Sequence, residues 1–409
     1  MKHLLFLCHR IPFPPNKGDK IRSFNMLKKL SENYIVHLAA FVDDPDDWQH
    51  KIKLEKYCAS VCLVNLNKKL ATIKSAIGLI SNRPLTLPYF YSAQIAEFTD
   101  NVLSTHNNAN IFVFSSSMGQ YVDGEKHSHL KRVIDFVDVD SDKWLQYSKK
   151  KSWPMNWVYR REAALLEKEE LRLAANFDKS LFVSPQEASY FEELVPQKLR
   201  NKIGFVLNGV DTKYFSASFY NKLEEEQPFL AFTGAMDYWA NVDAVVWFVK
   251  KVWPQLTVAY PNLKFYIVGG NPTDEVNALE AVDGIVVTGR VDDVRPYIKG
   301  ASLCIAPMRI ARGIQNKVLE AMAMGKPMVL TSMAADGILI PKEQQKYITD
   351  TADSFCESII DILSSENKQA VIGKANIAVI EQNFEWKSTL DSLLNSFDIQ
   401  KNNKNTASG

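Results

Sequence analysis

The sequence is poor in the features that mark secreted, membrane-spanning and nucleic-acid-binding proteins. It has only five cysteines in 409 residues, an odd and scattered set that favours reduced thiols in a cytoplasm over a disulfide framework. No stretch reaches the ~18 consecutive apolar residues that span a bilayer, and the N-terminus is too briefly apolar for a signal peptide. The formal net charge is only +1, whereas nucleic-acid binders are usually clearly basic. We therefore expect a cytoplasmic protein with no nucleic-acid partner, and peripheral attachment to a membrane stays open.

Metal ligands are scarce as well. All seven histidines precede residue 130, and none occupies an obvious catalytic position, although His9, beside the first glycine loop, is the best placed to touch a ligand. Cys58 and Cys62 are four residues apart, but no second pair of cysteines or histidines lies near them to complete a zinc site. The acidic run at residues 138–142 resembles a metal-binding DxD motif only loosely. We predict no metal.

What the chain does have is a regular alternation of apolar runs and amphipathic segments. Its length suits two domains of about 200 residues, and strands that alternate with helices predict parallel sheets. The expected strands are residues 4–8, 36–41, 61–66, 111–114, 133–137 and 179–184, then 229–232, 265–268, 285–288, 301–305 and 328–330. We predict an α/β protein of two doubly wound, Rossmann-like domains.

A turn signal separates the two predicted domains. Asn208 and Gly209 form the strongest two-residue turn signal of the chain. The expected division is residues 1–207, residues 208–380, a helix at 381–400 that returns to the first domain, and a disordered tail at 401–409 that is rich in Asn and Lys.

Residues 305–330 carry the strongest functional signal. An apolar run ends at Pro307, a basic loop with Gly313 follows, and a helix is expected from about Lys317. Gly325 and Pro327 end that helix before another apolar strand. A helix N-terminus presents unpaired N–H groups and partial positive charge, so this loop is suited to an anion. Glu320, one turn further, is suited to hydroxyl groups beyond that anion.

The same stretch carries a family resemblance. Residues 307–329 read P-x-R-x-x-R-G-x-x-x-K-V-L-E-A-M-A-x-G-K-P-x-V, which resembles the signature of the retaining GT-B glycosyltransferases of glycosyltransferase family four. In that family a Glu–seven residues–Glu motif lies here, and its second Glu, matched by Glu320, binds the donor ribose. The first Glu, which contacts the transferred sugar, is replaced by Arg312.

The resemblance implies the GT-B fold, in which the two domains face each other across a cleft. It further implies transfer of a sugar from a nucleoside diphosphate sugar to a hydroxyl, with retained anomeric configuration and without a metal. The donor is a substrate, so no cofactor is expected. The implied acceptor is a glycan or lipid-linked glycan of cell-surface polysaccharide biosynthesis.

The residues expected at the site follow from this resemblance and from charge. In many family members the loop after the first strand of the second domain supplies Arg and Lys to the phosphates, but the loop of Gly234 has neither before Lys250. We therefore expect basic residues of later loops to hold the diphosphate, because Arg forks match phosphate oxygens. The expected catalytic residues are Arg312, Lys317 and Asp138, and the expected donor-binding residues are Glu320, Gly313, Arg290, Arg309, Gly234, Gly18, Gln315 and Asn316.

Two features of the first domain leave alternatives open. Asp138 follows a strand and can contact substrate, with Asp135 as an internal structural partner. Lys17, Lys20 and Arg22, next to Gly18, can meet anions, and for Lys17 and Lys20 the alternative is a solvated turn.

Two basic, aromatic segments at residues 68–92 and 144–173 either face a membrane or acceptor or pack on the domain.

Two other functions compete with transfer. A sugar-nucleotide epimerase shares the two-domain plan but needs acid–base pairs and a histidine in the cleft, which this sequence does not supply. A nucleotide-sugar-binding relative without transferase activity is motivated by Arg312 in place of Glu.

Overall fold

The protein was analysed as a computed structural model, which describes residues 1–80, 82–149, 151–219, 221–223, 225–310 and 313–397. The chain forms two compact units. The first comprises Met1–Leu207 together with the segment that begins at Leu390, and the second comprises Asn208–Thr389. The tail at 401–409 lies outside the described residues.

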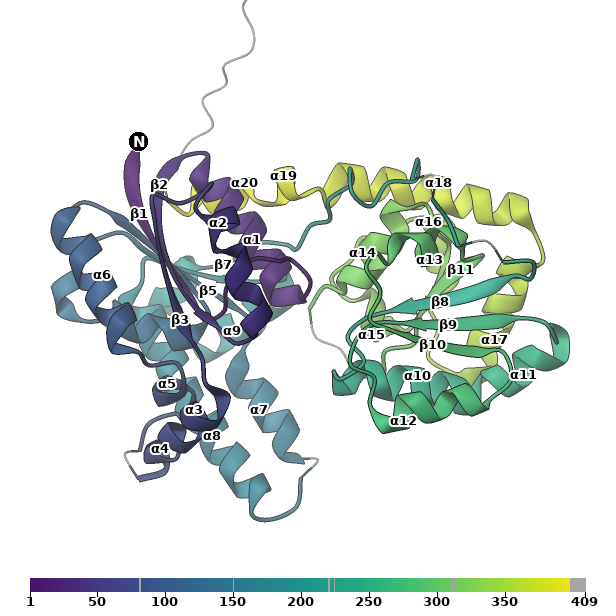
Figure 1. The fold of residues 1–409 in the computed structure, drawn as a ribbon, viewed down its shortest axis with the longest axis horizontal. Coiled ribbons are helices and arrows are strands. Elements are labelled where there is room, and N and C mark those ends of the chain that lie inside the picture. Colours follow the sequence, from purple (N-terminus) through teal and green to yellow (C-terminus); the bar gives the residue numbers. More distant parts are fainter. Residues whose placement is uncertain (81, 150, 220, 224, 311–312, 398–409) are drawn as a thin grey trace, which may run out of the picture. The chain divides into compact units, whose positions relative to one another are not determined.

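The first unit is built on a seven-stranded parallel sheet (Figure 1). Its strands, in chain order, are β1 (Lys2–Cys8), β2 (Tyr34–Val42), β3 (Ser60–Asn65), β4 (Asn110–Phe114), β5 (Arg132–Val137), β6 (Lys179–Phe182) and β7 (Ile203–Phe205). Their order in the sheet is β3-β2-β1-β4-β5-β6-β7. The central position of β1 explains its composition, because Leu4 to Cys8 are all fully buried and strands covered on both faces read as continuous apolar runs.

The helices of the first unit lie on both faces of this sheet or extend away from it. They are α1 (Gly18–Ser31), η1 (Pro45–His50), α2 (Lys51–Leu54), α3 (Lys68–Ser75), α4 (Ile77–Ile80), α5 (Thr86–Tyr89), α6 (Ala93–Thr105), η2 (Ser116–Tyr121), η3 (Glu125–His127), α7 (Asp140–Lys149), α8 (Met155–Asn176), α9 (Pro185–Leu194), η4 (Gln197–Lys202) and α20 (Asp391–Asn395). Leu5 and Leu7 of β1 pack in one core with Ile95 and Leu103 of α6. Figure 1 shows α6 on one side of the sheet and α1 on the other.

Helices α7 and α8 extend away from the sheet as an antiparallel pair, near α3, α4 and α5 (Figure 1). Buried Glu162 of α8 accepts hydrogen bonds from the backbone N–H of Leu85 and of Thr86, at 2.7 and 3.1 Å. The Arg161 guanidinium donates to the Gly78 carbonyl at 2.6 Å. These contacts hold the two predicted basic, aromatic segments next to each other.

The second unit has a five-stranded parallel sheet of order β10-β9-β8-β11-β12. The strands are β8 (Phe229–Thr233), β9 (Lys264–Val268), β10 (Ile285–Gly289), β11 (Leu303–Ala306) and β12 (Met328–Leu330). The apolar runs predicted each of these strands, and the prediction of two doubly wound, Rossmann-like units is confirmed.

The helices of the second unit are α10 (Trp239–Lys251), α11 (Trp253–Ala259), α12 (Asp274–Asn277), η5 (Ala278–Ala281), α13 (Arg295–Gly300), α14 (Asn316–Ala323), α15 (Ser332–Ala335), α16 (Lys342–Gln345), α17 (Ala352–Leu363), α18 (Glu366–Asn383) and α19 (Trp386–Thr389). In Figure 1, α10 and α12 lie below the five-stranded sheet and α13, α14 and α18 lie above it. None of the helices in the described part of the chain is both long and apolar enough to cross a bilayer.

The single helix expected over residues 381–400 is wrong. In the described part of that range, residues 381–397, the chain forms the end of α18, then α19 and α20. The break follows from a competing hydrogen bond, because the Phe384 carbonyl accepts from the Val210 backbone N–H at 2.7 Å. Glu385 pairs with Val210 as an isolated bridge, and Trp386 packs so closely on Gly209 that a Cβ there would lie 2.8 Å from the Trp386 nitrogen.

Candidate functional site

Helix α14 lies where the sequence predicted it and begins without a side-chain cap. Gly313 has φ +63, a left-handed conformation that favours glycine, and Gln315 precedes the helix in an extended conformation without capping through its side chain. The Gln315 amide instead donates to the Gly313 carbonyl at 3.1 Å. The Asn316 side-chain oxygen accepts from the Asn208 amide at 3.2 Å. The first turn of α14 therefore keeps N–H groups that a ligand can use.

Lys317 is directed toward the end of β8. Its Nζ donates to the Asn241 Oδ1 at 2.5 Å and lies 4.2 Å from the centroid of the Phe232 ring. Burial lowers the pKa of Lys317 to about 7, and the nearby Glu320 opposes that shift. None of the described carboxylates forms a hydrogen bond with this ammonium group, so an anion that arrives would stabilise its charge.

The loop of Gly234 is pressed against the loop that follows β9. The Gly234 N–H donates to the Val268 carbonyl at 3.0 Å. A Cβ on Gly269 would lie 1.6 Å from the Gly234 carbonyl oxygen, so only glycine fits at 269. A Cβ on Gly234 would lie 2.7 Å from the Asn241 amide nitrogen and 3.4 Å from the Lys317 Nζ. Gly234 is therefore a close neighbour of Lys317, as the predicted site requires.

Asn241 is a site residue that the sequence analysis missed. It is buried in the first turns of α10, and its amide donates to the Ala235 carbonyl at 2.9 Å while its oxygen accepts from Lys317. It thus joins the loop after β8 to the first turn of α14. No sequence signal separates this asparagine from an ordinary polar residue at the start of a helix.

Glu320 lies one turn further along α14. Burial raises the pKa of its carboxyl to about 7, and Lys317 opposes the shift. Among the described residues, none forms a hydrogen bond or ion pair with this carboxylate, and its side chain remains partly accessible. The charge of Glu320 helps raise the pKa of the Tyr214 hydroxyl, for which burial is the largest cause. The Tyr214 ring in turn lies 3.7 Å under the Arg295 guanidinium. Glu320 is therefore an acceptor available to ligand hydroxyls.

The structure places the predicted arginines differently. Arg309 forms a two-point ion pair with Asp243 of α10, with N–O distances of 2.5 and 3.1 Å. This pair lines a cavity of about 740 Å³ together with Trp239 and Trp247, so binding a phosphate would require Arg309 to leave its carboxylate. Arg290 is exposed directly after β10. Arg312 lies outside the described residues.

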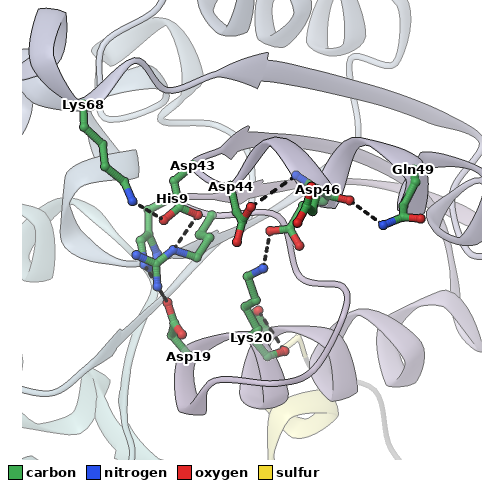
Figure 2. Close-up of polar contacts among 11 residues, drawn as sticks. His9, Asp19, Lys20, Asp43, Asp44, Asp46, Gln49 and Lys68 are labelled. Carbon is green, nitrogen blue, oxygen red and sulfur yellow. Dashed lines mark hydrogen bonds and ion pairs between the residues drawn. The ribbon is translucent and has the colours of Figure 1, made fainter. Parts of the chain in front are cut away.

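Gly18 is the first residue of α1, exposed and preceded by Lys17 in an extended conformation. The neighbouring charges lie in ion pairs, several of which Figure 2 shows. Arg10 binds the carboxylates of Asp19 at 2.6 Å and Asp43 at 3.0 Å. The pKa of the Asp19 carboxyl lies well below its usual range. Burial acts to raise this pKa, but the hydrogen bond from His9 and the charge of Arg10 lower it by more.

Two cations considered for anion binding next to Gly18 serve the interior of the first unit instead. Lys20 is buried in an ion pair with Asp47 (Figure 2). Arg22 is buried against Asp135, with nitrogen–oxygen distances of 2.8 and 3.1 Å, and also donates to the Val206 carbonyl at 2.7 Å. Asp135 is thus the internal partner that the sequence predicted.

Asp138 follows β5 and is half-buried among other carboxyl groups. Glu187 accepts from the Val139 N–H at 2.8 Å, and Glu170 accepts from the Ser141 hydroxyl at 2.6 Å. Burial raises the pKa of Glu187 to about 7, with a smaller contribution from Asp138. Burial raises the pKa of Glu170 to about 8. Glu170 and Glu187 could not be predicted from the sequence, because both lie in helices distant in sequence from Asp138. The substrate role of Asp138 stays a prediction.

Comparison with known proteins gives this geometry a context. Residues 227–365, which include β8 to β12 and α14, match the family model described as glycosyl transferases group 1. An uncharacterized 44.6 kDa protein in the cps region of Klebsiella pneumoniae is 20% identical over 411 residues, covering 96% of this chain and 99% of that protein.

Two solved structures resemble the whole chain. The structure of Alr3699/HepE from Anabaena in complex with UDP and glucose is 14% identical, with a TM-score of 0.63, and covers 97% of this chain and 100% of that one. WaaG, a glycosyltransferase involved in lipopolysaccharide biosynthesis, gives the same TM-score of 0.63 and identity of 14%, with coverage of 97% and 100%. The structural likeness shows the fold of two Rossmann-like units, and the family match lies within the second of them.

Proposed function

We propose that this protein is a retaining glycosyltransferase that moves a sugar from a nucleoside diphosphate sugar to a hydroxyl of a glycan or lipid-linked acceptor in cell-surface polysaccharide biosynthesis. The observation that carries the proposal is that one turn of α14 holds both a buried cation, suited to a diphosphate, and a carboxylate, suited to ribose hydroxyls. Lys317 presents an ammonium group beside the glycine loop after β8, and Glu320 presents a carboxylate without a hydrogen-bond partner among the described residues. The family match over residues 227–365 includes both residues.

The diphosphate end of the proposed donor site is assigned to Lys317 and the N-terminus of α14. Lys317 is held by Asn241 and lies over the Phe232 ring, so its position is set before a ligand arrives. A diphosphate next to it would raise its lowered pKa and keep the ammonium charged. Preorganised cations and helix N–H groups stabilise developing charge on a leaving group, and the proposal gives this task to them rather than to a metal ion.

The nucleoside end is assigned to Glu320. A carboxylate accepts hydrogen bonds from both hydroxyls of a ribose, and bonds to a charged acceptor are stronger than those between neutral groups. UDP is the natural first ligand to try, because HepE of Anabaena, of similar fold, was crystallised with UDP and with UDP-glucose.

The proposed chemistry is a displacement on one face of the sugar. The bond between the anomeric carbon and the diphosphate oxygen breaks, and the acceptor oxygen forms the new bond on the same face. The acceptor proton passes to the departing phosphate oxygen, so no covalent enzyme intermediate is needed. Lys317 and the helix N-terminus offset the charge that builds on the diphosphate, and Arg312, Arg309 and Arg290 remain candidates for further phosphate contacts.

We also propose that the α7–α8 pair brings the first unit to a membrane that carries the acceptor. Trp153 is 83% exposed and Trp157 is 56% exposed, so neither fills the core. Ile73 on the neighbouring α3 is 68% exposed, and Lys74 and Lys151 are exposed nearby in sequence. Exposed tryptophan and lysine together suit the interface of an anionic bilayer. A Trp153→Ser, Trp157→Ser variant should lose co-sedimentation with phosphatidylglycerol vesicles, and equal sedimentation of variant and wild type would refute this part.

The proposed reaction is tested in two steps. A thermal-shift screen of UDP, GDP, ADP and dTDP sugars identifies the donor, because a ligand that binds only the folded protein raises the melting temperature of the protein. The selected donor, radiolabelled in its sugar, is then incubated with lipid-linked oligosaccharides, and the anomeric proton of the product is assigned by NMR. Transfer with retained configuration supports the proposal. Nucleotide binding without any transfer would favour a binding-only relative, and an altered sugar nucleotide without acceptor would favour an epimerase.

A further inference from the structure

Three histidines that the proposed reaction does not use meet in the first unit. His3 lies on β1, His37 lies on β2, and His106 caps the C-terminus of α6. One ring nitrogen of each histidine can be chosen so that the three atoms all lie within 4.8 Å of one another. We call these residues the imidazole cluster.

The rings of the imidazole cluster are stacked and in direct contact. The His3 Nδ1 and the His37 Nε2 are 2.9 Å apart. The ring centroids of His3 and His106 are 3.5 Å apart, and those of His37 and His106 are 5.1 Å apart. Three imidazoles that meet in this way are candidate ligands, because histidine binds metals through its ring nitrogens.

A fourth side chain sets the orientation of one ring. The His37 Nδ1 lies 2.7 Å from the Ser60 hydroxyl, and His37 and Ser60 are register partners on β2 and β3. When Nδ1–H donates to this hydroxyl, the lone pair of Nε2 is directed toward His3. Metal-binding histidines are commonly oriented by such a bond from the other ring nitrogen.

We propose that the imidazole cluster binds a zinc ion through His3, His37 and His106, with water completing a tetrahedral shell. Zinc bound to three imidazole nitrogens at about 2.0–2.1 Å holds them roughly 3.4 Å apart. The pair at 2.9 Å must open slightly, and the stacked rings must turn, because the lone pair of an imidazole nitrogen lies in the ring plane and all three must converge on the ion. His106 is the ring best able to move, because it is only half-buried at a helix end.

The place of the cluster in the fold indicates a structural ion rather than a catalytic one. His3 is the second residue of β1, and Ser60 is the first residue of β3, so the cluster lies toward the amino ends of the strands. Ligands of open α/β sheets bind outside the opposite, carboxyl ends. Zinc here would join β1 and β2 to the end of α6, stabilising the first unit without taking part in transfer.

The test uses the full-length chain, stripped of metal and supplied with zinc chloride. Wild type should retain one zinc per chain after desalting and melt at a higher temperature than the stripped protein. The matched variants are His106→Gln, within the cluster, and His129→Gln, an exposed histidine outside it. His106→Gln should weaken zinc binding by at least about tenfold and lose the thermal shift, whereas His129→Gln should behave as wild type.

A second ligand and a second metal keep the result interpretable. His3→Gln should have the same effect as His106→Gln, and circular dichroism shows whether either variant is folded. Cobalt added to the stripped wild type should give the visible absorption of tetrahedral coordination, absent from both cluster variants. The proposal is overturned if wild type retains no more zinc than His106→Gln, or if His129→Gln loses binding equally.

Discussion

Replacing Glu320 with glutamine should separate donor binding from stability. The substitution keeps the size of the side chain and one oxygen acceptor but removes the charge. In the free protein this carboxylate is half-buried, and none of the described residues forms a hydrogen bond with it. Its removal therefore breaks no hydrogen bond or ion pair with the described residues, whereas it takes the charged acceptor from the proposed ribose site.

The expected size of each effect follows from this environment. A hydrogen bond to a charged group contributes about 1.5–3 kcal/mol, so losing the charge should raise the donor Kd by roughly tenfold to a hundredfold. Burial raises the pKa of Glu320 to about 7 from an ordinary value near 4.5. Ionisation of Glu320 is thus disfavoured in the folded state. The ionised carboxylate therefore lowers the free energy of unfolding, and this effect grows from pH 4.5 and is complete above pH 7. At pH 8 the variant should resist urea at least as well as wild type.

Calorimetry with the donor selected by thermal shift, and urea unfolding without ligand, measure the two effects. Glu343→Gln is the matched control, because Glu343 is an exposed glutamate of α16 in the same unit; it should change neither quantity. The reasoning is refuted if Glu320→Gln binds the donor as tightly as wild type. It is equally refuted if the free variant is clearly less stable, because Glu320 would then have a structural role.

Three further predictions concern the same units. Burial lowers the pKa of Lys317 to about 7, so the wild-type donor Kd should rise by up to about tenfold per pH unit above 7. In calorimetry, Lys317→Met should bind the donor weakly at pH 7, and its Kd should not change with pH in this way. Gly269→Ala places a Cβ 1.6 Å from the Gly234 carbonyl oxygen and should cost about 3 kcal/mol in urea unfolding, and an unchanged midpoint would contradict the close packing. Asp135→Leu leaves the Arg22 guanidinium buried without its carboxylate and should cost about 3–5 kcal/mol by the same assay, so a loss below 1 kcal/mol would argue against the ion pair.

The strands and the main helices could be predicted because their signals are local. The run from Leu4 to Cys8 has only apolar residues where a central parallel strand is covered on both faces. The start of α14 was predictable to one residue, because Gly313 and the apolar spacing of Val318, Leu319 and Met322 mark it. The sequence alone therefore predicts that Lys317 and Glu320 lie on one turn of a helix.

The pairing of charges could not be predicted, because partners far apart in sequence decide it. Arg309 was expected to face phosphate, but Asp243 lies 66 residues away in sequence and holds its guanidinium. Arg22 was considered for an anion, and its actual partner, Asp135, is 113 residues away. The sequence shows that these charged residues are present, but only the fold determines which of them form ion pairs.

Tertiary contacts also override local helix signals. The pattern of residues 381–400 is helical, but the Phe384 carbonyl bonds to Val210 instead of continuing α18. Likewise His3, His37 and His106 belong to three separate elements and share no motif, so only the folded chain brings them together.

The most direct test of the central claim is a crystal structure of the protein with the nucleoside diphosphate that gives the largest thermal shift. The account predicts diphosphate oxygens within hydrogen-bond distance of the Lys317 Nζ and the first N–H groups of α14, with the ribose hydroxyls donating to Glu320. A nucleotide bound elsewhere, with Lys317 still held only by Asn241 and Glu320 facing water, would contradict it.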